Sequence, residues 1–505
     1  PGGVYGVNNG TSMAAPHISG IAALLRGINP TLHVAELANI ITSTATPLST
    51  TLPNNESGWG RADAFSAVMR LINPAIITGT VRTTAGQGIS GASVQAQSHT
   101  DPNLSSQVVS GEDGAYSMAV MPGTYDFITS AFGYYAQEIN GVEATVNPDG
   151  ELNFVLISQP TGIVQGQVSI TNSGQPVTEA LMISLASTPV STAVSPAGSY
   201  RMTAPPGAYT LSVTSLGYRV FNMAINILAN EVITHDIQLI PAPKLLLVDE
   251  GRWYFESQSA YWSQALNALG YTYDLRVIKS PPQDTPSYQE LSTYDIVLWS
   301  SPRGAPGLVN GADPIHQFLS EGGRLFISGQ NIAFFDGGGT YDTGPQEYLN
   351  DLLDASFAGE LSVVNEIQGK GPFDGLQLPI FGQEGADNQI SPDIIQLSKT
   401  DMTLQPWVFD SGQGAGSAVN LCTTYRAMFF GFGFEAINGE HNRVEVMRRS
   451  LDWLTTEPVT TGFMIQHITN PVQIGTAGQT ITHSLAVRHI GIAGDLENVT
   501  VAGHG

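Results

Sequence analysis

Cysteine is almost absent from this chain of 505 residues, in which Cys422 stands alone. A single thiol excludes an intramolecular disulfide framework and any metal cluster built on cysteines. Basic residues are also scarce, because 19 Lys and Arg stand against 43 Asp and Glu and the formal net charge is -24. Nucleic acid and anionic membranes are therefore poor partner candidates, since clustered cations are needed to neutralise phosphate. No apolar run in the sequence approaches the roughly 18 residues that a membrane span requires.

Length and local patterning predict a multidomain chain. At roughly 100 to 200 residues per domain, 505 residues correspond to three or four domains. Residues 1–74 have helical periodicity, strongest over Ala14 to Leu25 and over Val34 to Thr44. Residues 75–241 alternate Val, Ile, Thr and Tyr between Gly and Pro turns, which is typical of antiparallel strands.

Strand and helix patterns alternate from residue 243 to residue 456, here called the α/β region. Such alternation favours a parallel, doubly wound sheet. Residues 460–505 have β character, and we expect the start of a truncated immunoglobulin-like β domain there. The expected strands of the α/β region are Leu245–Val248, Ile296–Trp299, Arg324–Ser328 and Ala427–Phe432, and the expected helices are Ser257–Leu269 and Val444–Leu454.

The β-rich region is a tandem repeat, residues 75–158 (module 1) followed by residues 161–241 (module 2). Seven residues recur at a constant offset of 84 positions, which chance rarely produces. The recurring residues are Gly114, Tyr116, Pro122, Gly123, Tyr125, Gly133 and Tyr134, matched by Gly198, Tyr200, Pro206, Gly207, Tyr209, Gly217 and Tyr218.

The sharpest motif is NGTSMAAPH at residues 9–17, which opens an apolar helix. A Ser at the start of a buried helix lies where free N–H groups and the helix dipole favour a developing negative charge. Ser12 is therefore a candidate nucleophile whose own N–H is an oxyanion donor. We expect Gly10 to permit a close approach and Pro16 to lie in the first turn, where a missing N–H is tolerated. The alternative is a purely structural Ser that caps a buried helix. The wall of the candidate site consists of Gly10, Thr11 and Met13.

This motif resembles the serine-nucleophile motif of the subtilisin-like serine proteases, the S8 type, which begins a central buried helix. GWGRADA at residues 58–64 resembles the Gly-x-Gly turn before the last helix of that fold. The resemblance implies that residues 1–74 are the C-terminal part of a peptidase domain and that Ser12 is its nucleophile. The family order is Asp, His and then Ser, with the oxyanion Asn also ahead of the Ser. We therefore expect all three to lie before Pro1, so that this piece alone hydrolyses no peptide bonds although its parent does.

His17 is not the expected general base, although it lies only five residues after Ser12. On the same helix its ring cannot lie behind the Ser hydroxyl, and in the resembled family this position is structural. Residues 1–74 also lack most of the sheet that would bury their apolar helices. We therefore expect this region to be exposed, mobile or rearranged.

Both modules resemble the carboxypeptidase regulatory-like domain, a small transthyretin-like β-sandwich that is also similar to starch-binding modules. The resemblance rests on Gly-x-Tyr, Pro-Gly-x-Tyr and Gly-Tyr sequences, as at residues 114–116, 122–125 and 133–134. It makes polysaccharide a candidate partner, because Tyr rings can stack on sugars. Period-2 spacing beside turns favours core packing instead. The tyrosines concerned are Tyr116, Tyr125, Tyr200 and Tyr209.

The α/β region resembles the class I glutamine amidotransferase-like fold. Catalytic members carry a Cys on a sharp turn from strand to helix, whereas the corresponding turn at residues 328–332 reads SGQNI. Cys422 lies among apolar strand residues, where a buried and inert thiol is expected. We therefore predict a non-catalytic domain, with Gln330 and Asn331 placed to bind a ligand at the carboxyl end of a strand.

No cofactor and no metal site are indicated by residue spacing. Two acidic, Gly-rich turns, residues 336–342 and residues 147–151, offer the oxygen ligands that Ca²⁺ prefers. Neither turn has a recognised loop spacing, so structural calcium is not established and solvated turns are the favoured interpretation.

The sequence favours a piece of a secreted, extracellular or cell-surface serine endopeptidase that acts on protein or peptide substrates. Its β modules and amidotransferase-like region would be non-catalytic appendages. The alternative is a non-catalytic surface protein for adhesion or carbohydrate binding that carries a degenerate protease remnant. An intact Asp and His upstream would favour the serine endopeptidase.

Overall fold

The computed structural model describes residues 10–458, together with the backbone of residues 463–467 and 485–489. Within the first range it leaves out residues 56, 73, 103, 147–150, 178–180, 255, 340–342, 363, 401 and 420–422. Cys422, residues 340–342 and 147–150 of the two candidate calcium turns, and most residues of the expected C-terminal β domain therefore lie outside the described residues. The chain divides into two compact units, and strands of module 2 contribute to both. No helix in the described part is long and apolar enough to cross a membrane.

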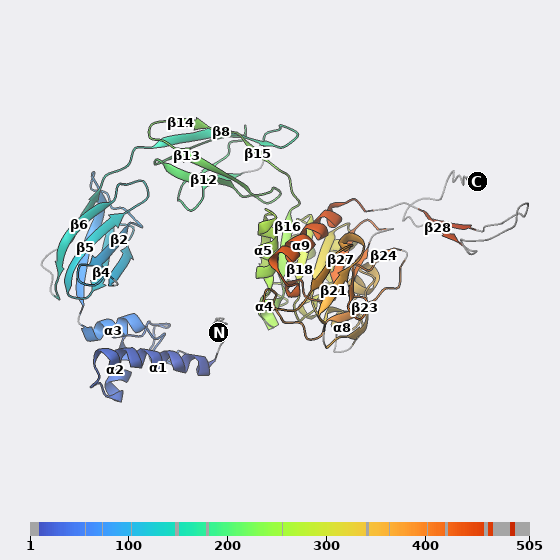
Figure 1. The fold of residues 1–505 in the computed structure, drawn as a ribbon, viewed down its shortest axis with the longest axis horizontal. Helices are drawn as coiled ribbons and strands as arrows, with labels where there is room; N and C mark the ends of the chain where they lie inside the picture. Colours follow the sequence, from blue (N-terminus) through green and yellow to red (C-terminus); the bar gives the residue numbers. More distant parts are fainter. Residues whose placement is uncertain are drawn as a thin grey trace, which may run out of the picture. The chain divides into compact units, whose positions relative to one another are not determined.

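The N-terminal segment is helical, as its periodicity predicts. Its elements are α1 (Thr11–Ile28), α2 (Val34–Ser43) and α3 (Ala64–Ile72) (Figure 1). They share a small core in which Leu25 and Ala67 are fully buried. Much apolar surface stays uncovered, because Leu24 is 56% exposed and Phe65 58% exposed. The expectation that this segment would be exposed is thus confirmed.

Module 1 consists of two sheets that face each other across an apolar core. One sheet has the order β4-β1-β7 and the other β3-β2-β5-β6 (Figure 1). Alternate residues point inward, so Tyr116, Tyr125, Phe127 and Phe154 lie in the core. The strands are β1 (Ala75–Thr83), β2 (Ser93–Ser98), β3 (Ser105–Val109), β4 (Ala115–Val120), β5 (Gly123–Ser130), β6 (Gln137–Ala144) and β7 (Phe154–Leu156).

Module 2 repeats this plan. Its sheets have the orders β11-β8-β14, with β15 also paired to β8, and β10-β9-β12-β13. The strands are β8 (Gly162–Ile170), β9 (Met182–Leu185), β10 (Ser191–Ala193), β11 (Ser199–Ala204), β12 (Gly207–Val213), β13 (Phe221–Ile227), β14 (Val232–Thr234) and β15 (Ile237–Leu239).

One cluster of contacts recurs in both modules and supports the repeat read from the sequence. The Tyr116 hydroxyl donates to the carbonyl oxygen of Leu152 over 2.7 Å, and the Tyr200 hydroxyl donates to that of His235 over 2.7 Å. In module 2 the Tyr ring lies against Gly166, where an added Cβ would come within 3.0 Å of the ring. Gly79 takes the same place in module 1, with 3.1 Å to Tyr116. Equal chemistry at matched positions thus produces equal packing.

The α/β region is built on a seven-stranded sheet of order β17-β16-β18-β19-β27-β26-β24. The strands β17, β16, β18, β19 and β27 are parallel, and their order corresponds to the doubly wound order 2-1-3-4-5. The next strand, β26, pairs antiparallel with both β27 and β24. The strands are β16 (Leu245–Asp249), β17 (Tyr273–Val277), β18 (Ile296–Ser300), β19 (Arg324–Ser328), β24 (Thr403–Leu404), β26 (Gly416–Val419) and β27 (Arg426–Phe430).

Each face of this sheet has its own apolar layer. Leu245 and Leu247 pack in one layer with α5 (Ser259–Ala268) and α9 (Glu440–Thr455). Leu246 and Val248 pack in the other with α7 (Ala312–Ser320) and α8 (Ile332–Asp336). Every residue of β16 is buried, which explains why its sequence is a continuous apolar run rather than an alternating one. The strand and helix alternation read from the sequence thus corresponds to this sheet, whereas the amidotransferase-like resemblance stays a prediction.

Short elements complete the described part of the chain. The helical ones are α4 (Gly251–Tyr254), α6 (Tyr288–Leu291), η1 (Pro306–Val309), η2 (Tyr348–Leu352), η3 (Gly371–Phe373) and η4 (Phe434–Ala436). The strands are β20 (Ser356–Glu360), β21 (Glu366–Gly369), β22 (Gln377–Pro379), β23 (Asp393–Gln396) and β25 (Trp407–Phe409), followed by the antiparallel pair β28 (Phe463–His467) and β29 (Leu485–His489).

Candidate functional site

Ser12 is the second residue of α1, and its side chain is exposed. The N–H groups of Met13 and Ala14 both donate to the carbonyl oxygen of Gly10, over 3.0 and 3.2 Å. The N–H of Ser12 precedes these bonds and therefore lies outside the hydrogen-bond ladder of the helix. It points from the positive end of the helix dipole, which favours an anion beside it. The first turn of α1 thus offers a hydroxyl and a free donor on one residue.

The glycine ahead of Ser12 acts through its conformation. Gly10 caps α1 with φ 120° and ψ 164°, a region that residues with a Cβ rarely adopt. A Cβ built at Gly10 would meet nothing within 4 Å. The expectation that Gly10 permits a close approach is therefore not supported by the described residues. The turn needs glycine because of its backbone angle.

Pro16 lies deeper in the helix than the sequence reading expected. It is the sixth residue of α1 and thus falls in the second turn rather than the first. Because proline has no N–H, the carbonyl oxygen of Ser12 loses its intrahelical donor four residues on. Both backbone groups of Ser12 are consequently outside the helical ladder.

His17 is engaged with its own helix. Its Nδ1 lies 2.7 Å from the carbonyl oxygen of Met13, which is four residues earlier. This contact agrees with the sequence argument that His17 does not serve Ser12 as general base. Within the described part of the chain, no carboxylate or imidazole forms a hydrogen bond with the Ser12 hydroxyl.

The second subtilisin-like sequence, at residues 58–64, forms a turn that depends on glycine. Gly60 has φ 114°, and an added Cβ would lie 2.3 Å from the carbonyl oxygen of Thr46. That close approach lets Thr46 and Arg61 exchange two backbone hydrogen bonds, of 2.8 and 2.9 Å. Asp63 then accepts from the N–H of Ser66 over 2.9 Å at the start of α3, and this bond holds the pKa of Asp63 below its usual range.

Comparison with known proteins places the protease likeness on this segment. Residues 1–60 match the model of the subtilase family, and residues 76–157 match that of the carboxypeptidase regulatory-like domain. Sixty-four residues are 50% identical to Bacillopeptidase F of Bacillus subtilis (strain 168), and 64 are 41% identical to the extracellular serine protease of Serratia marcescens. A stretch of 48 residues is 52% identical to subtilisin of Bacillus pumilus.

These matches are local. They cover 12%, 13% and 10% of this chain and 4%, 6% and 18% of the three relatives. Among solved structures, the minor pilin GBS52 of Streptococcus agalactiae covers 33% of this chain and 97% of its own, with 13% identity. Its TM-score is 0.22, which is too low to show a shared fold. The family likeness is thus established for the short N-terminal stretch and for module 1.

The tyrosines of the modules pack inward. Tyr116, Tyr125 and Tyr200 are 6%, 1% and 4% exposed, and Tyr209 is half-buried. Burial raises the pKa of Tyr200 to about 12. Buried rings cannot stack on a sugar, so the interpretation as core residues holds for these three, and sugar stacking on them is excluded.

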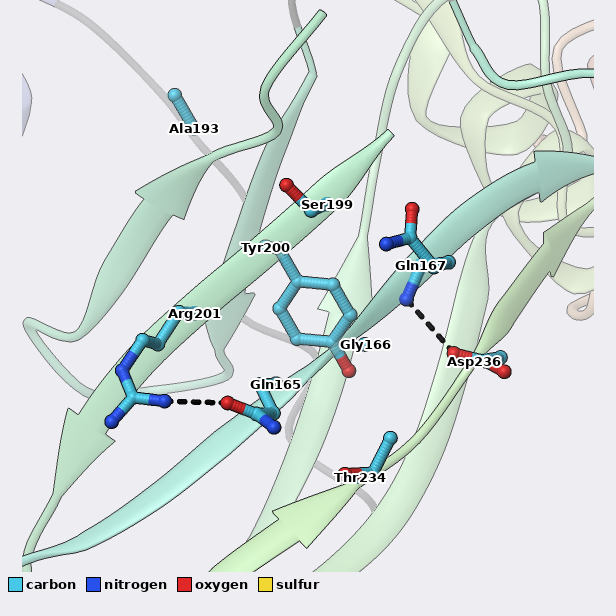
Figure 2. Close-up of a pocket in the computed structure, with 9 residues that line it drawn as sticks. All are labelled: Gln165, Gly166, Gln167, Ala193, Ser199, Tyr200, Arg201, Thr234 and Asp236. Atoms are coloured by element: carbon cyan, nitrogen blue, oxygen red, sulfur yellow. Dashed lines mark hydrogen bonds between the residues drawn. The ribbon is translucent and has the colours of Figure 1, made fainter. Parts of the chain in front are cut away.

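Module 2 carries a groove on the outer face of its sheet, with a volume of about 430 Å³. Figure 2 shows Arg201 and Gln165 at one end and Gln167 and Asp236 at the other. Arg201 donates to the Gln165 side chain over 2.5 Å, and the N–H of Gln167 donates to Asp236 over 2.9 Å. The sequence reading missed this groove, because its residues come from four separate strands, β8, β10, β11 and β14. The lining consists of Gln165, Gly166, Gln167, Ala193, Ser199, Tyr200, Arg201, Thr234 and Asp236.

Two sequence expectations for the α/β region require correction. Gln330 is fully buried, and its amide binds the backbone of the loop at residues 388–391, so its side chain is part of the core and does not face solvent. Asn331 is the N-cap residue just before α8, and its φ is 66°. Asp336 does not lie in a solvated turn, because it is fully buried and accepts from the N–H of Gly307 and from the Tyr348 hydroxyl, each over 2.8 Å. Sequence reasoning could not see these partners, which are distant along the chain.

Buried carboxyl groups gather near the carboxyl ends of the parallel strands. Burial raises the pKa of Glu250 to about 8 and that of Asp336 to about 6. The indole Nε1 of Trp299 donates to Glu250 over 2.6 Å. Among the described residues, no group of three or more His, Cys, Asp or Glu side chains could hold a metal ion.

Proposed function

We propose that this chain is a C-terminal part of a secreted, subtilisin-like serine endopeptidase, with Ser12 as the nucleophile. The single observation that carries the proposal is the subtilase match over residues 1–60, which includes Ser12 in the first turn of α1. One relative of the stretch is named as an extracellular serine protease, and the other two are named Bacillopeptidase F and subtilisin. Those names support protein or peptide substrates and an extracellular or cell-surface location.

In this proposal the Ser12 hydroxyl attacks the scissile carbonyl carbon. A His of the preceding part of the peptidase domain takes the hydroxyl proton, and an Asp orients that His. The N–H of Ser12 donates to the oxyanion as the carbonyl becomes tetrahedral, aided by the positive end of α1. Gly10, Thr11 and Met13 form the wall beside the reacting carbon. The His, the Asp and an oxyanion Asn are contributed by family resemblance.

The rest of the chain would serve as accessory domains. We propose modules at residues 75–158 and 161–241, a non-catalytic amidotransferase-like domain at residues 243–456, and an immunoglobulin-like domain that starts at residue 460. The turn at residues 328–332 has no thiol, which supports the absence of amidotransferase chemistry.

A fluorophosphonate probe tests the nucleophile in the complete parent polypeptide. We expect stoichiometric labelling that is lost in Ser12→Ala and kept in Ser19→Ala, an exposed residue of the same helix whose hydroxyl donates to the carbonyl oxygen of Ala15. The 505 residues alone have neither a His nor an Asp ahead of Ser12, so we expect this piece to show no peptidase turnover.

The result that would overturn the proposal is a folded parent that takes no label. It would indicate a degenerate triad and would favour the alternative, a non-catalytic adhesion or carbohydrate-binding protein. Labelling that survives Ser12→Ala would place the nucleophile elsewhere.

A further inference from the structure

The groove on module 2 is where the two modules differ most clearly in chemistry. Their frameworks agree, because Asn153 accepts from the N–H of Thr80 over 2.7 Å in module 1, just as Asp236 accepts from that of Gln167 in module 2. This match and the shared Gly and Tyr pair align the two sheets residue by residue.

The aligned positions carry different side chains. Arg201 and Gln165 of module 2 correspond to Ser117 and Thr78 of module 1. Module 2 therefore presents a guanidinium and a primary amide where module 1 presents two small hydroxyls. The same backbone frame thus holds a guanidinium at this position in module 2 and a small hydroxyl at the matched position in module 1.

Arg201 is a cation with donors to spare. Its side chain is exposed, and the Gln165 oxygen occupies one of its five N–H groups. Within the described part of the chain no Asp or Glu forms an ion pair with Arg201. A planar guanidinium of this kind binds a carboxylate through two parallel hydrogen bonds. One end of the groove is thus suited to an anionic group.

The other end of the groove suits hydroxyl groups. Asp236 offers a carboxylate oxygen there, Ser199 and Gln167 offer a hydroxyl and an amide, and the Thr234 hydroxyl lies closer to Gln165 (Figure 2). These side chains line one continuous groove that crosses the neighbouring strands β11, β8 and β14 (Figure 2). A volume of about 430 Å³ falls in the range of small-molecule sites, roughly 300 to 1,000 Å³.

We propose that this groove binds an acidic polysaccharide, with the carboxylate of a uronic acid on Arg201 and ring hydroxyls on Asp236, Gln167 and Thr234. An acidic peptide is the competing occupant, because β11 is an edge strand of its sheet, and the measurements below separate the two. Recognition here uses no aromatic stacking, in agreement with the burial of Tyr200. The proposal depends on module 2 alone and is independent of the protease chemistry.

Affinity electrophoresis and titration calorimetry of the full 505-residue chain with polygalacturonate test the proposal. We expect binding that weakens as salt rises, since a charge pair is screened. Arg201→Ala should weaken binding at least 10-fold, whereas Arg201→Lys should retain part of it because the charge stays and the fork is lost. Ser117→Ala, the matched position in module 1, should leave binding unchanged.

Three results would overturn the assignment. If the unmodified chain does not bind polygalacturonate at low salt, the proposed site does not exist. If Arg201→Ala binds as tightly as the parent, Arg201 does not contact the ligand. Equal binding of polyglutamate with the same dependence on Arg201 would replace the sugar by an acidic peptide. Neutral starch serves as the uncharged control, and we expect it to bind more weakly than polygalacturonate. Circular dichroism of each variant confirms that module 2 is folded.

Discussion

Ser12 owes its setting to two neighbours that act on the backbone. Gly10 adopts φ 120°, which turns the chain into α1, and Pro16 removes the donor that would pair with the carbonyl oxygen of Ser12. The free N–H follows from the place of Ser12 in the first turn of α1, and the carbonyl oxygen without a helical donor follows from Pro16. Neither neighbour needs to touch a substrate for the geometry to hold.

A single hydroxyl in each module carries a measurable share of stability. Tyr200→Phe removes the donor to the carbonyl oxygen of His235, a bond made by a ring that is 4% exposed. A buried acceptor left without a donor costs about 1 to 3 kcal/mol. Hydrogen exchange of β8 and β11 should therefore accelerate by roughly 5- to 160-fold.

Tyr135→Phe is the matched control for this prediction, because Tyr135 is 52% exposed. We expect no change in exchange for that variant. Equal exchange in Tyr200→Phe and the parent would show that the bond contributes nothing.

At the scale of elements, the turn before β17 is held by module 2. Arg219 donates to the carbonyl oxygen of Leu269 over 2.5 Å and lies 3.4 Å from the ring centre of Tyr271. The Thr272 hydroxyl donates to the carbonyl oxygens of Ser215 and Tyr218, over 2.9 and 3.1 Å. This contact joins a loop of the β module to the edge of the parallel sheet.

Arg219→Ala should loosen that junction. The substitution removes a charged hydrogen bond and a cation–π contact, which together contribute on the order of 1 to 3 kcal/mol. Faster hydrogen exchange at residues 269–272 measures the loss. Arg201→Ala, an exposed residue of the same module, should leave these amides unchanged. If both variants exchange alike, the contact is not a determinant of the junction.

At the scale of the whole molecule, the net charge and the buried acids both lower the free energy of unfolding as pH rises. Burial raises the pKa of Glu250 to about 8 and that of Asp336 to about 6. The folded state therefore holds protons that the unfolded state has released, and the free energy of unfolding falls as pH rises through this window. The formal net charge of -24 adds repulsion as acids ionise.

We expect the α/β region to unfold at a lower urea concentration at pH 8.5 than at pH 5.5. The free energy of unfolding should be lower at pH 8.5 by several kcal/mol. Near-ultraviolet circular dichroism reports this region, since Trp262, Trp299 and Trp407 are fully buried in it. Glu250→Gln keeps an acceptor for Trp299 and should flatten the pH dependence. A midpoint that rises with pH in the parent would contradict the burial of a neutral carboxyl group.

Surface ion pairs on α9 add a small contribution to stability that is lost at acidic pH. Contacts with Arg448 and Arg449 lower the pKa of Glu445 to about 2. Its contribution is present above the usual carboxyl range and is lost only as pH falls toward that value. Because these side chains are partly exposed, solvent screening keeps the effect small.

The sequence by itself determined the features that depend on local patterns. The periodicity of Ala14 to Leu25 predicted α1, the apolar run at Leu245 predicted a strand, and the offset of 84 positions predicted two like modules. The motif around Ser12 could be recognised from the sequence because its functional groups lie within a few consecutive residues. Patterns of this kind depend on neighbours along the chain, and the sequence contains them directly.

Only the tertiary structure decided which polar groups meet across long distances. Gln330 binds a loop some 60 residues away, Asp336 is buried beneath Gly307, and Arg201 meets Gln165 across two strands. Each of these side chains is ordinary in its local sequence, so composition and spacing assign it to solvent. Burial and partnership depend on the packing of whole elements, and this is why the groove and the buried carboxyl groups became visible in the fold alone.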